Sequence, residues 1–92
     1  MPAAVQMQEL DEDRLEPMPL DGMVLPLIRM AEEDRPPYFE VKVGEQAYRY
    51  ERSYPIKGFS AVMPKFIQAQ LDAGKKPLII ERPQRYLVYL NI

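Results

Sequence analysis

Residues 59–74 form the best-bounded amphipathic segment of the sequence, and they predict an α-helix. One face of this helix carries side chains at the three- and four-residue spacing that buries a helix against another element. These positions are Met63, Phe66, Ile67, Gln70 and Leu71. Ser60 suits the N-cap, and Gly74 suits the left-handed residue that ends a helix. Because so short a helix is marginal in water, it requires a sheet to pack against.

Residues 38–52, which precede this helix, predict a β-hairpin. Gly44 and Glu45 suit a two-residue turn that begins with glycine. Apolar and polar residues alternate on both sides of this turn, so one face of the hairpin is expected to be buried. This register pairs Val43 with Gln46, Val41 with Tyr48, Glu40 with Arg49, and Phe39 with Tyr50. The buried face would carry Phe39, Val41, Val43, Tyr48 and Tyr50.

Two apolar runs after the helix, residues 77–81 and 86–90, predict a second hairpin around a turn at residues 82–85. Both runs are apolar on both faces. That pattern is typical of strands in the middle of a sheet.

The chain before residue 38 gives weaker signals. Residues 23–30 predict a strand, and Pro26 places this strand at an edge of the sheet or at a bulge. A helix from Pro26 to Asp34 is the alternative, since proline is favoured at the first helical position. Residues 1–20 combine three prolines with an acidic cluster, and they predict a flexible arm.

Together these segments predict a single α+β domain over residues 21–92. Its antiparallel sheet would consist of two β-hairpins in the order ββαββ, with one helix packed across a face. The strand from residues 23–30 would add an N-terminal edge to this sheet.

The composition removes most catalytic chemistry. The 92 residues include no histidine, the commonest general base, and no cysteine, the usual thiolate nucleophile. No glycine-rich phosphate-binding motif occurs, and the acidic runs 11–13 and 32–34 lack the spacing of a calcium loop. We therefore expect no enzymatic activity, no catalytic or metal-binding residue and no cofactor. The lack of a long apolar run favours a soluble, cytoplasmic protein.

The first functional hypothesis starts from a surplus of apolar surface. Residues 24–28, 78–80 and 86–90 offer more apolar surface than one helix can cover. A large patch of this kind on a small protein usually contacts a partner, and two-fold homodimers are the commonest solution. The sequence therefore predicts a protein-interaction module that self-associates through its sheet. The residues expected at the interface are Val24, Leu25, Leu27, Ile28, Ile79, Tyr86 and Val88.

The second hypothesis is nucleic-acid binding by residues 48–59, in which tyrosines are interleaved with cations. Such a pattern can hold a single strand, because rings stack on bases and cations contact phosphates. Residues 1–34 carry a net charge of −7 and residues 35–92 a net charge of +5, so the acidic leader could occupy the basic surface in the free protein. The expected contacts are Arg49, Arg52, Tyr54, Lys57, Lys75, Lys76, Arg82 and Arg85.

Overall fold

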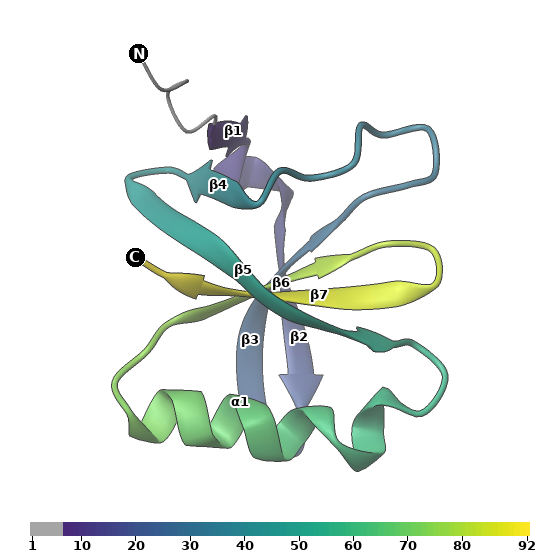
Figure 1. The fold of residues 1–92 in the computed structure, drawn as a ribbon, viewed down its shortest axis with the longest axis vertical. Helices are drawn as coiled ribbons and strands as arrows, with labels where there is room; N and C mark the ends of the chain where they lie inside the picture. Colours follow the sequence, from purple (N-terminus) through teal and green to yellow (C-terminus); the bar gives the residue numbers. More distant parts are fainter. Residues whose placement is uncertain (1–6) are drawn as a thin grey trace.

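The structure, a computed structural model, describes residues 7–92 and shows one mixed sheet with a single α-helix packed on it (Figure 1). The strands are β1 (Met7–Leu10), β2 (Leu15–Leu20), β3 (Met23–Arg29), β4 (Glu40–Val43), β5 (Gln46–Pro55), β6 (Pro77–Glu81) and β7 (Arg85–Asn91). The helix is α1 (Met63–Asp72), and two short 3-10 turns are η1 (Glu12–Arg14) and η2 (Phe59–Ala61).

The seven strands lie in the order β1-β4-β5-β7-β6-β3-β2. The pairs β1–β4 and β3–β6 are parallel, and the other neighbouring pairs are antiparallel. The prediction of an antiparallel ββαββ sheet of two hairpins was therefore wrong. A third hairpin, β2–β3, and the separate strand β1 complete the sheet, and both parallel pairings join segments that are distant in the sequence.

The two hairpins on either side of α1 were predicted correctly. In β4–β5 the structure pairs Val43 with Gln46, Val41 with Tyr48, and Glu40 with Arg49. The β6–β7 hairpin turns after Glu81, and its strands lie in the interior of the sheet, as their apolar faces indicated.

Strand β3 was expected at an edge of the sheet, and this prediction was wrong because β3 lies between β6 and β2. Pro26 is accommodated because the ladder with β6 starts only at Leu27. On the other side Pro26 faces Pro17 of β2, and neither residue can donate a backbone hydrogen bond. The alternative of a helix beginning at Pro26 was also wrong.

Strands β1 and β2 both lie within residues 1–20, for which the sequence predicted a flexible arm. Residues 1–6 of that segment lie outside the described residues. In β2, Met18 and Leu20 are buried while the residues between and before them are exposed, which is the alternation of a half-buried strand. Asp21 and Gly22 join β2 to β3 with φ values of 48° and 83°, as a type I′ hairpin turn requires.

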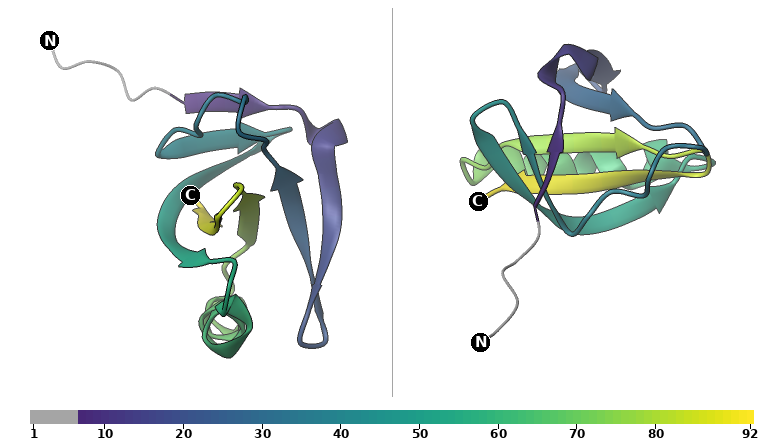
Figure 2. Two further views of the ribbon diagram at one scale, coloured as in Figure 1. Left: turned by 90° about the vertical axis from the view of Figure 1, so that its right-hand side faces the viewer. Right: turned by 90° about the horizontal axis from the view of Figure 1, so that it is seen from above.

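Strands β1 and β2 follow one another in the chain but occupy opposite ends of the strand order. Residues 11–14, which include η1, are the whole connection between them. So short a connection brings the two edges of the sheet close together, and the sheet curls strongly as a result (Figure 2).

Both faces of the curled sheet are covered by the chain itself (Figure 2). On one face, α1 packs through Met63 and Ile67 on a cluster that includes Leu25, Ile79 and Val88. On the other face, the β1–β4 end of the sheet folds over β6 and β7. The buried residues of this second cluster are Leu10, Ile28, Met30, Val41, Val43, Leu78, Ile80 and Tyr89. Most of the apolar surplus that motivated self-association therefore lies in the interior of the fold.

The helix is shorter than residues 59–74, because its first part is the 3-10 turn η2. Ser60 does not cap it, since Val62 occupies the N-cap position and no side chain accepts a hydrogen bond there. The C-terminal end agrees with the sequence: Gly74 has a φ of 79°, and the backbone N–H of Lys75 donates to the Gln70 carbonyl at 2.9 Å. Among residues 7–92, no helix has the length and apolar character that a membrane crossing requires.

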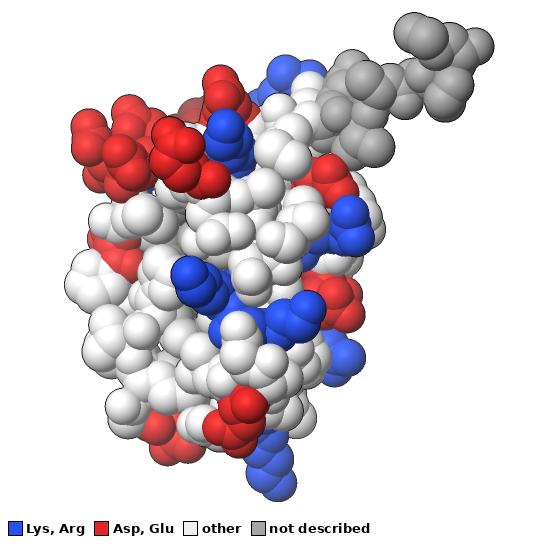
Figure 3. Space-filling view, turned by 90° about the vertical axis from the view of Figure 1, so that its left-hand side faces the viewer, with Lys and Arg blue, Asp and Glu red and all other residues white. Residues whose placement is uncertain are grey.

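Acidic and basic side chains are separated on the surface. Figure 3 shows Asp and Glu side chains gathered at one upper corner and Lys and Arg side chains in the middle of the same face. In the described part of the chain, no carboxylate of the acidic leader forms an ion pair with the basic residues proposed to contact nucleic acid. Within residues 7–92, the ion pairs of the leader join Asp34 to Arg14, and Glu16 to Arg29.

Candidate binding groove

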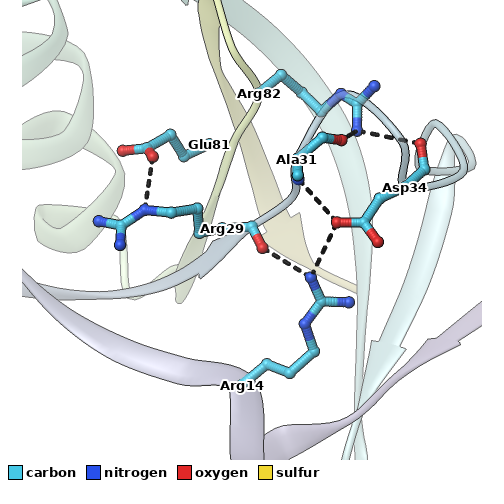
Figure 4. A network of polar contacts seen from close by, with 6 residues as sticks. All are labelled: Arg14, Arg29, Ala31, Asp34, Glu81 and Arg82. Carbon is cyan, nitrogen blue, oxygen red and sulfur yellow. Dashed lines mark hydrogen bonds and ion pairs between the residues drawn. The ribbon is translucent and has the colours of Figure 1, made fainter.

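Residues 31–39 form a loop between β3 and β4, and a network of polar contacts fixes its first half (Figure 4). The Arg14 guanidinium donates to the Arg29 carbonyl at 2.7 Å and lies 3.4 Å from the Asp34 carboxylate. The same carboxylate accepts from the Ala31 N–H at 2.7 Å. From the β6–β7 turn, Arg82 donates to the Ala31 carbonyl at 2.9 Å. The loop is thus tied both to the β1–β2 connection and to the β6–β7 turn.

The second half of this 31–39 loop is held through Tyr38. Its N–H donates to the Gln8 side chain at 3.0 Å, and its carbonyl accepts from the Tyr89 hydroxyl at 2.7 Å. The Arg35 guanidinium lies 4.7 Å from the centre of the Tyr38 ring, a cation–π geometry. Burial and, to a lesser extent, the neighbouring Tyr50 raise the pKa of the Tyr89 hydroxyl, so this hydroxyl remains a donor over the physiological pH range.

Two hollows lie between the 31–39 loop and the β5–β7 part of the sheet, and they share Leu87. The first, which we call the aromatic hollow, has a volume of about 300 Å³. It is lined by Pro37, Tyr38, Phe39, Tyr50, Leu87 and Tyr89. The second, the arginine hollow, has a volume of about 280 Å³. It is lined by Glu32, Arg82, Pro83, Gln84, Arg85 and Leu87. Both hollows are shallow and they adjoin at Leu87, so we refer to them together as the groove, with an aromatic end and a cationic end.

The aromatic hollow presents a large apolar side chain to solvent. Phe39 is 61% exposed, although its alternation with Val41 predicted a buried position. The prediction failed because β4 begins at Glu40, so Phe39 belongs to the loop and not to the strand. Its ring meets Tyr50 edge to face at 6.1 Å, and Tyr50 meets Tyr89 in the same way at 5.7 Å. The three rings therefore pack edge to face on one another.

The arginine hollow is built around a positioned guanidinium. Arg85 donates through Nε to the Ser53 hydroxyl at 2.9 Å and through one terminal nitrogen to the Ser53 carbonyl at 3.4 Å. Arg82 is committed to the carbonyl groups of the 31–39 loop. The two arginines outweigh the single carboxylate of Glu32 in this hollow, so its net charge is positive.

The residues predicted at a self-association interface are mostly interior. Val24 is 71% exposed and Tyr86 is half-buried. The others have almost no exposed surface: Leu25, Leu27, Ile28, Ile79 and Val88.

The residues predicted to contact nucleic acid fall on separate surfaces. Arg82 and Arg85 line the groove at the start of β7, whereas Arg49 and Lys75 line another hollow of about 280 Å³ beside the end of β7. These ends are ~20 Å apart at the usual rise of a strand.

Several of these residues are also engaged within the fold. The Arg49 guanidinium is 2.8 Å from the carboxylate of Glu40. Tyr54 is buried, and the Arg52 guanidinium lies 4.0 Å from the centre of the Phe66 ring. Lys57 and Lys76 are exposed and line none of these hollows. The structure therefore brings only part of the predicted set together.

Sequence reasoning did not identify the aromatic end of the groove. The available signal was local: two prolines are followed at once by two aromatic residues, in residues 36–39. Within residues 7–92, no cluster of three or more acidic, histidine or cysteine side chains is arranged to hold a metal ion. Comparisons with protein-family models, with curated proteins and with solved structures gave no match for this chain.

Proposed function

We propose that the protein is a small non-enzymatic protein-interaction module and that its groove binds a short segment of a partner protein. The observation that carries this proposal is the exposed Phe39 ring. This ring belongs to the 31–39 loop, contacts Tyr50 edge to face and lines the aromatic hollow. A large exposed apolar side chain in a fixed concave site is a feature of binding surfaces and brings no benefit to stability.

The shape of the groove supports a peptide as the ligand. Its aromatic hollow, lined by tyrosine, phenylalanine and proline, resembles the aromatic-lined grooves that recognise extended segments. Contacts from Arg14, Arg82 and Tyr89 hold the loop that forms one wall. A wall that is already ordered lowers the entropic cost of binding.

Self-association through the sheet remains a prediction, but the structure weakens its original reason because most of the proposed interface is buried. The remaining exposed large apolar side chains come from different elements of the fold. In the described residues they are Met7, Leu15, Val24, Phe39, Val62 and Ile92. Of these, Phe39 is the one that lines a hollow together with other aromatic side chains.

Single-stranded nucleic acid is the second candidate, and the arginines beside the aromatic rings favour it. The charge of the groove favours it less, because Glu32 lines the arginine hollow and Arg82 is occupied by loop carbonyl groups. Titration of the protein into labelled oligo-dT at low and moderate salt tests this candidate, since phosphate contacts lose affinity steeply as salt rises.

Panning a phage-displayed library of random 12-residue peptides on the immobilised full-length protein tests the main proposal. We expect enriched peptides that lose binding to a Phe39→Ala variant. Val24→Ala is the matched control, because it removes another exposed apolar side chain that lies outside the groove. Failure to enrich any peptide, or equal binding to both variants, would contradict the proposal.

A further inference from the structure

The guanidinium of Arg85 has one occupied edge and one free edge. Its Nε and one terminal nitrogen both face Ser53, through the contacts of 2.9 and 3.4 Å. An arginine side chain carries five N–H groups in one plane, so the edge formed by its two terminal nitrogens keeps two parallel donors. In the described part of the chain, Arg85 forms no ion pair with a carboxylate. Ser53 therefore orients the Arg85 guanidinium so that its free N–H groups can bind a planar anion. A carboxylate matches the geometry of these two parallel donors.

The aromatic end of the groove and Arg85 lie along the same strand, β7. Arg85, Leu87 and Tyr89 are alternate residues of β7 and point to the same face of the sheet. Tyr50 pairs with Tyr89, so the rings lie around the second half of this row. Counted along the backbone of β7, the middle of the Leu87–Tyr89 part of this row is about three residues, or ~10 Å, from Arg85.

A polyproline II helix matches this distance with both groups on the same side. In a polyproline II helix there are three residues per turn and a rise of ~3.1 Å per residue, so residues i and i+3 face the same way and are ~9 Å apart. In a β-strand, by contrast, residues i and i+3 face opposite sides. Proline is also the side chain that stabilises the polyproline II conformation and packs on aromatic rings.

Resting on the proposed function, we infer that the partner segment is an acidic polyproline II peptide, with a proline on the Phe39–Tyr50 rings and an Asp or Glu three residues away on Arg85. The exposed residues Pro83, Gln84 and Arg85 leave the cationic end open to solvent. A chain can therefore pass beyond Arg85, which assigns the anion to an internal side chain and not to a chain terminus.

Glu32 allows the proposed negative charge of the ligand to be tested, because it lines the same hollow as Arg85. Its carboxylate opposes an acidic ligand. Glu32→Gln is therefore expected to strengthen binding of the acidic peptide about two- to three-fold and to leave a neutral peptide unchanged. A purely structural effect of this substitution would change both peptides alike.

The experiment uses fluorescently labelled, terminally blocked peptides with Gly/Ser flanks, titrated with the full-length protein and read by fluorescence anisotropy. One pair carries proline and aspartate three residues apart, in each of the two chain directions. Matched peptides replace the aspartate by asparagine, replace the proline by glycine, or place the two residues next to each other. A further peptide ends in a free carboxylate in place of the aspartate, which separates the two sources of a carboxylate. Oligo-dT is the nucleic-acid arm.

We expect one chain direction of the spaced peptide to bind best, with the asparagine peptide about three- to ten-fold weaker. Arg85→Gln should remove this difference between the two peptides, and Phe39→Ala should weaken both about ten-fold or more. Lys57→Gln removes one positive charge away from the groove and is the matched control. Circular dichroism establishes that each variant is folded.

The outcomes separate this inference from the proposed function. Three results would overturn the inference alone, provided that Phe39→Ala still reduces binding. They are equal binding of the aspartate and asparagine peptides, tighter binding of the peptide with adjacent proline and aspartate, and a requirement for the free terminal carboxylate. Phe39-dependent binding of oligo-dT in place of the peptides would overturn both in favour of nucleic acid. Absence of binding by these peptides and by any library peptide would also overturn both.

Discussion

Pro17 and Pro26 lie directly opposite one another in the β2–β3 ladder. Opposite residues in an antiparallel ladder alternate between hydrogen-bonded and non-hydrogen-bonded pairs, and a proline has no N–H to donate. This pair must therefore be a non-hydrogen-bonded one, and the nitrogen of Pro17 faces the outer edge of β2. Pro19, two residues later, has the same orientation. Both prolines consequently remove donors from the exposed edge of the sheet and hinder pairing with another chain.

Replacing both edge prolines, by Pro17→Thr and Pro19→Thr, is expected to promote self-association. The substitutions supply two outward N–H groups without removing any hydrogen bond to β3. Sedimentation velocity at increasing protein concentration should show a larger apparent mass for the double variant than for the wild type. Pro36→Thr, in the exposed 31–39 loop, is the control that also removes a proline. An unchanged mass for the double variant would show that these prolines do not protect the edge.

The type I′ turn at Asp21 and Gly22 leads to a second prediction. Gly22→Ala should lower the free energy of unfolding by about 1 kcal/mol, because alanine is strained at a φ of 83°. Steric crowding does not contribute, since a Cβ at this position meets no atom within 4 Å. Urea unfolding provides the measurement. Asp21→Asn, which tolerates the left-handed conformation, should have little effect, and an equal loss from both substitutions would contradict this explanation.

A third prediction concerns Glu40, whose side chain is buried against the Arg49 guanidinium at 2.8 Å. Arg49→Met keeps the aliphatic stem but leaves the carboxylate without this partner. The free energy of unfolding should fall by about 1–3 kcal/mol. Glu40→Gln should cost less, because the amide oxygen can still accept from Arg49. Urea denaturation of both variants measures the difference. A smaller decrease in the free energy of unfolding for Arg49→Met than for Glu40→Gln would show that the buried Glu40 carboxylate does not depend on Arg49.

Alkaline pH should destabilise the protein through its buried tyrosines. Burial raises the pKa of Tyr89, and it also raises the pKa of Tyr48 and of Tyr86. In the unfolded chain these hydroxyls lose their protons near pH ~10, whereas the folded protein still holds them. Stability is therefore fully present below that pH and is lost as the pH rises above it. Unfolding free energies measured from pH 8 to 11 should show a shallower decline for Tyr89→Phe, and an identical slope would refute the role of Tyr89.

Local signals were sufficient for some elements and insufficient for others. The β4–β5 register followed from Gly44 and from strict alternation, two signals that agree. The β2–β3 hairpin was missed because Pro17 and Pro19, together with the acidic cluster, were interpreted as part of a flexible arm, and Pro26 was expected to place β3 at an edge of the sheet or at a bulge. In the structure each proline occupies a position that needs no N–H toward a neighbouring strand.

The parallel pairings and the groove depend on long-range contacts. Nothing within β1 indicates that it pairs with β4, which follows about thirty residues later. The groove exists because Arg82 and Tyr89, distant in the sequence, hold the 31–39 loop over β5 and β7. Composition identified arginine and tyrosine as candidate ligand contacts, but only the tertiary structure shows which of them meet.

The placement of β1 and β2 at opposite margins of the sheet has a consequence for biosynthesis. The β2–β3 hairpin can join the sheet only after β6 is available to pair with β3. Strand β1 can pair only after β4 has been synthesised. During translation, β1 and the β2–β3 hairpin therefore leave the ribosome well before β4 and β6, which pair with β1 and β3, and the sheet cannot be completed until β6 and β7 have been synthesised.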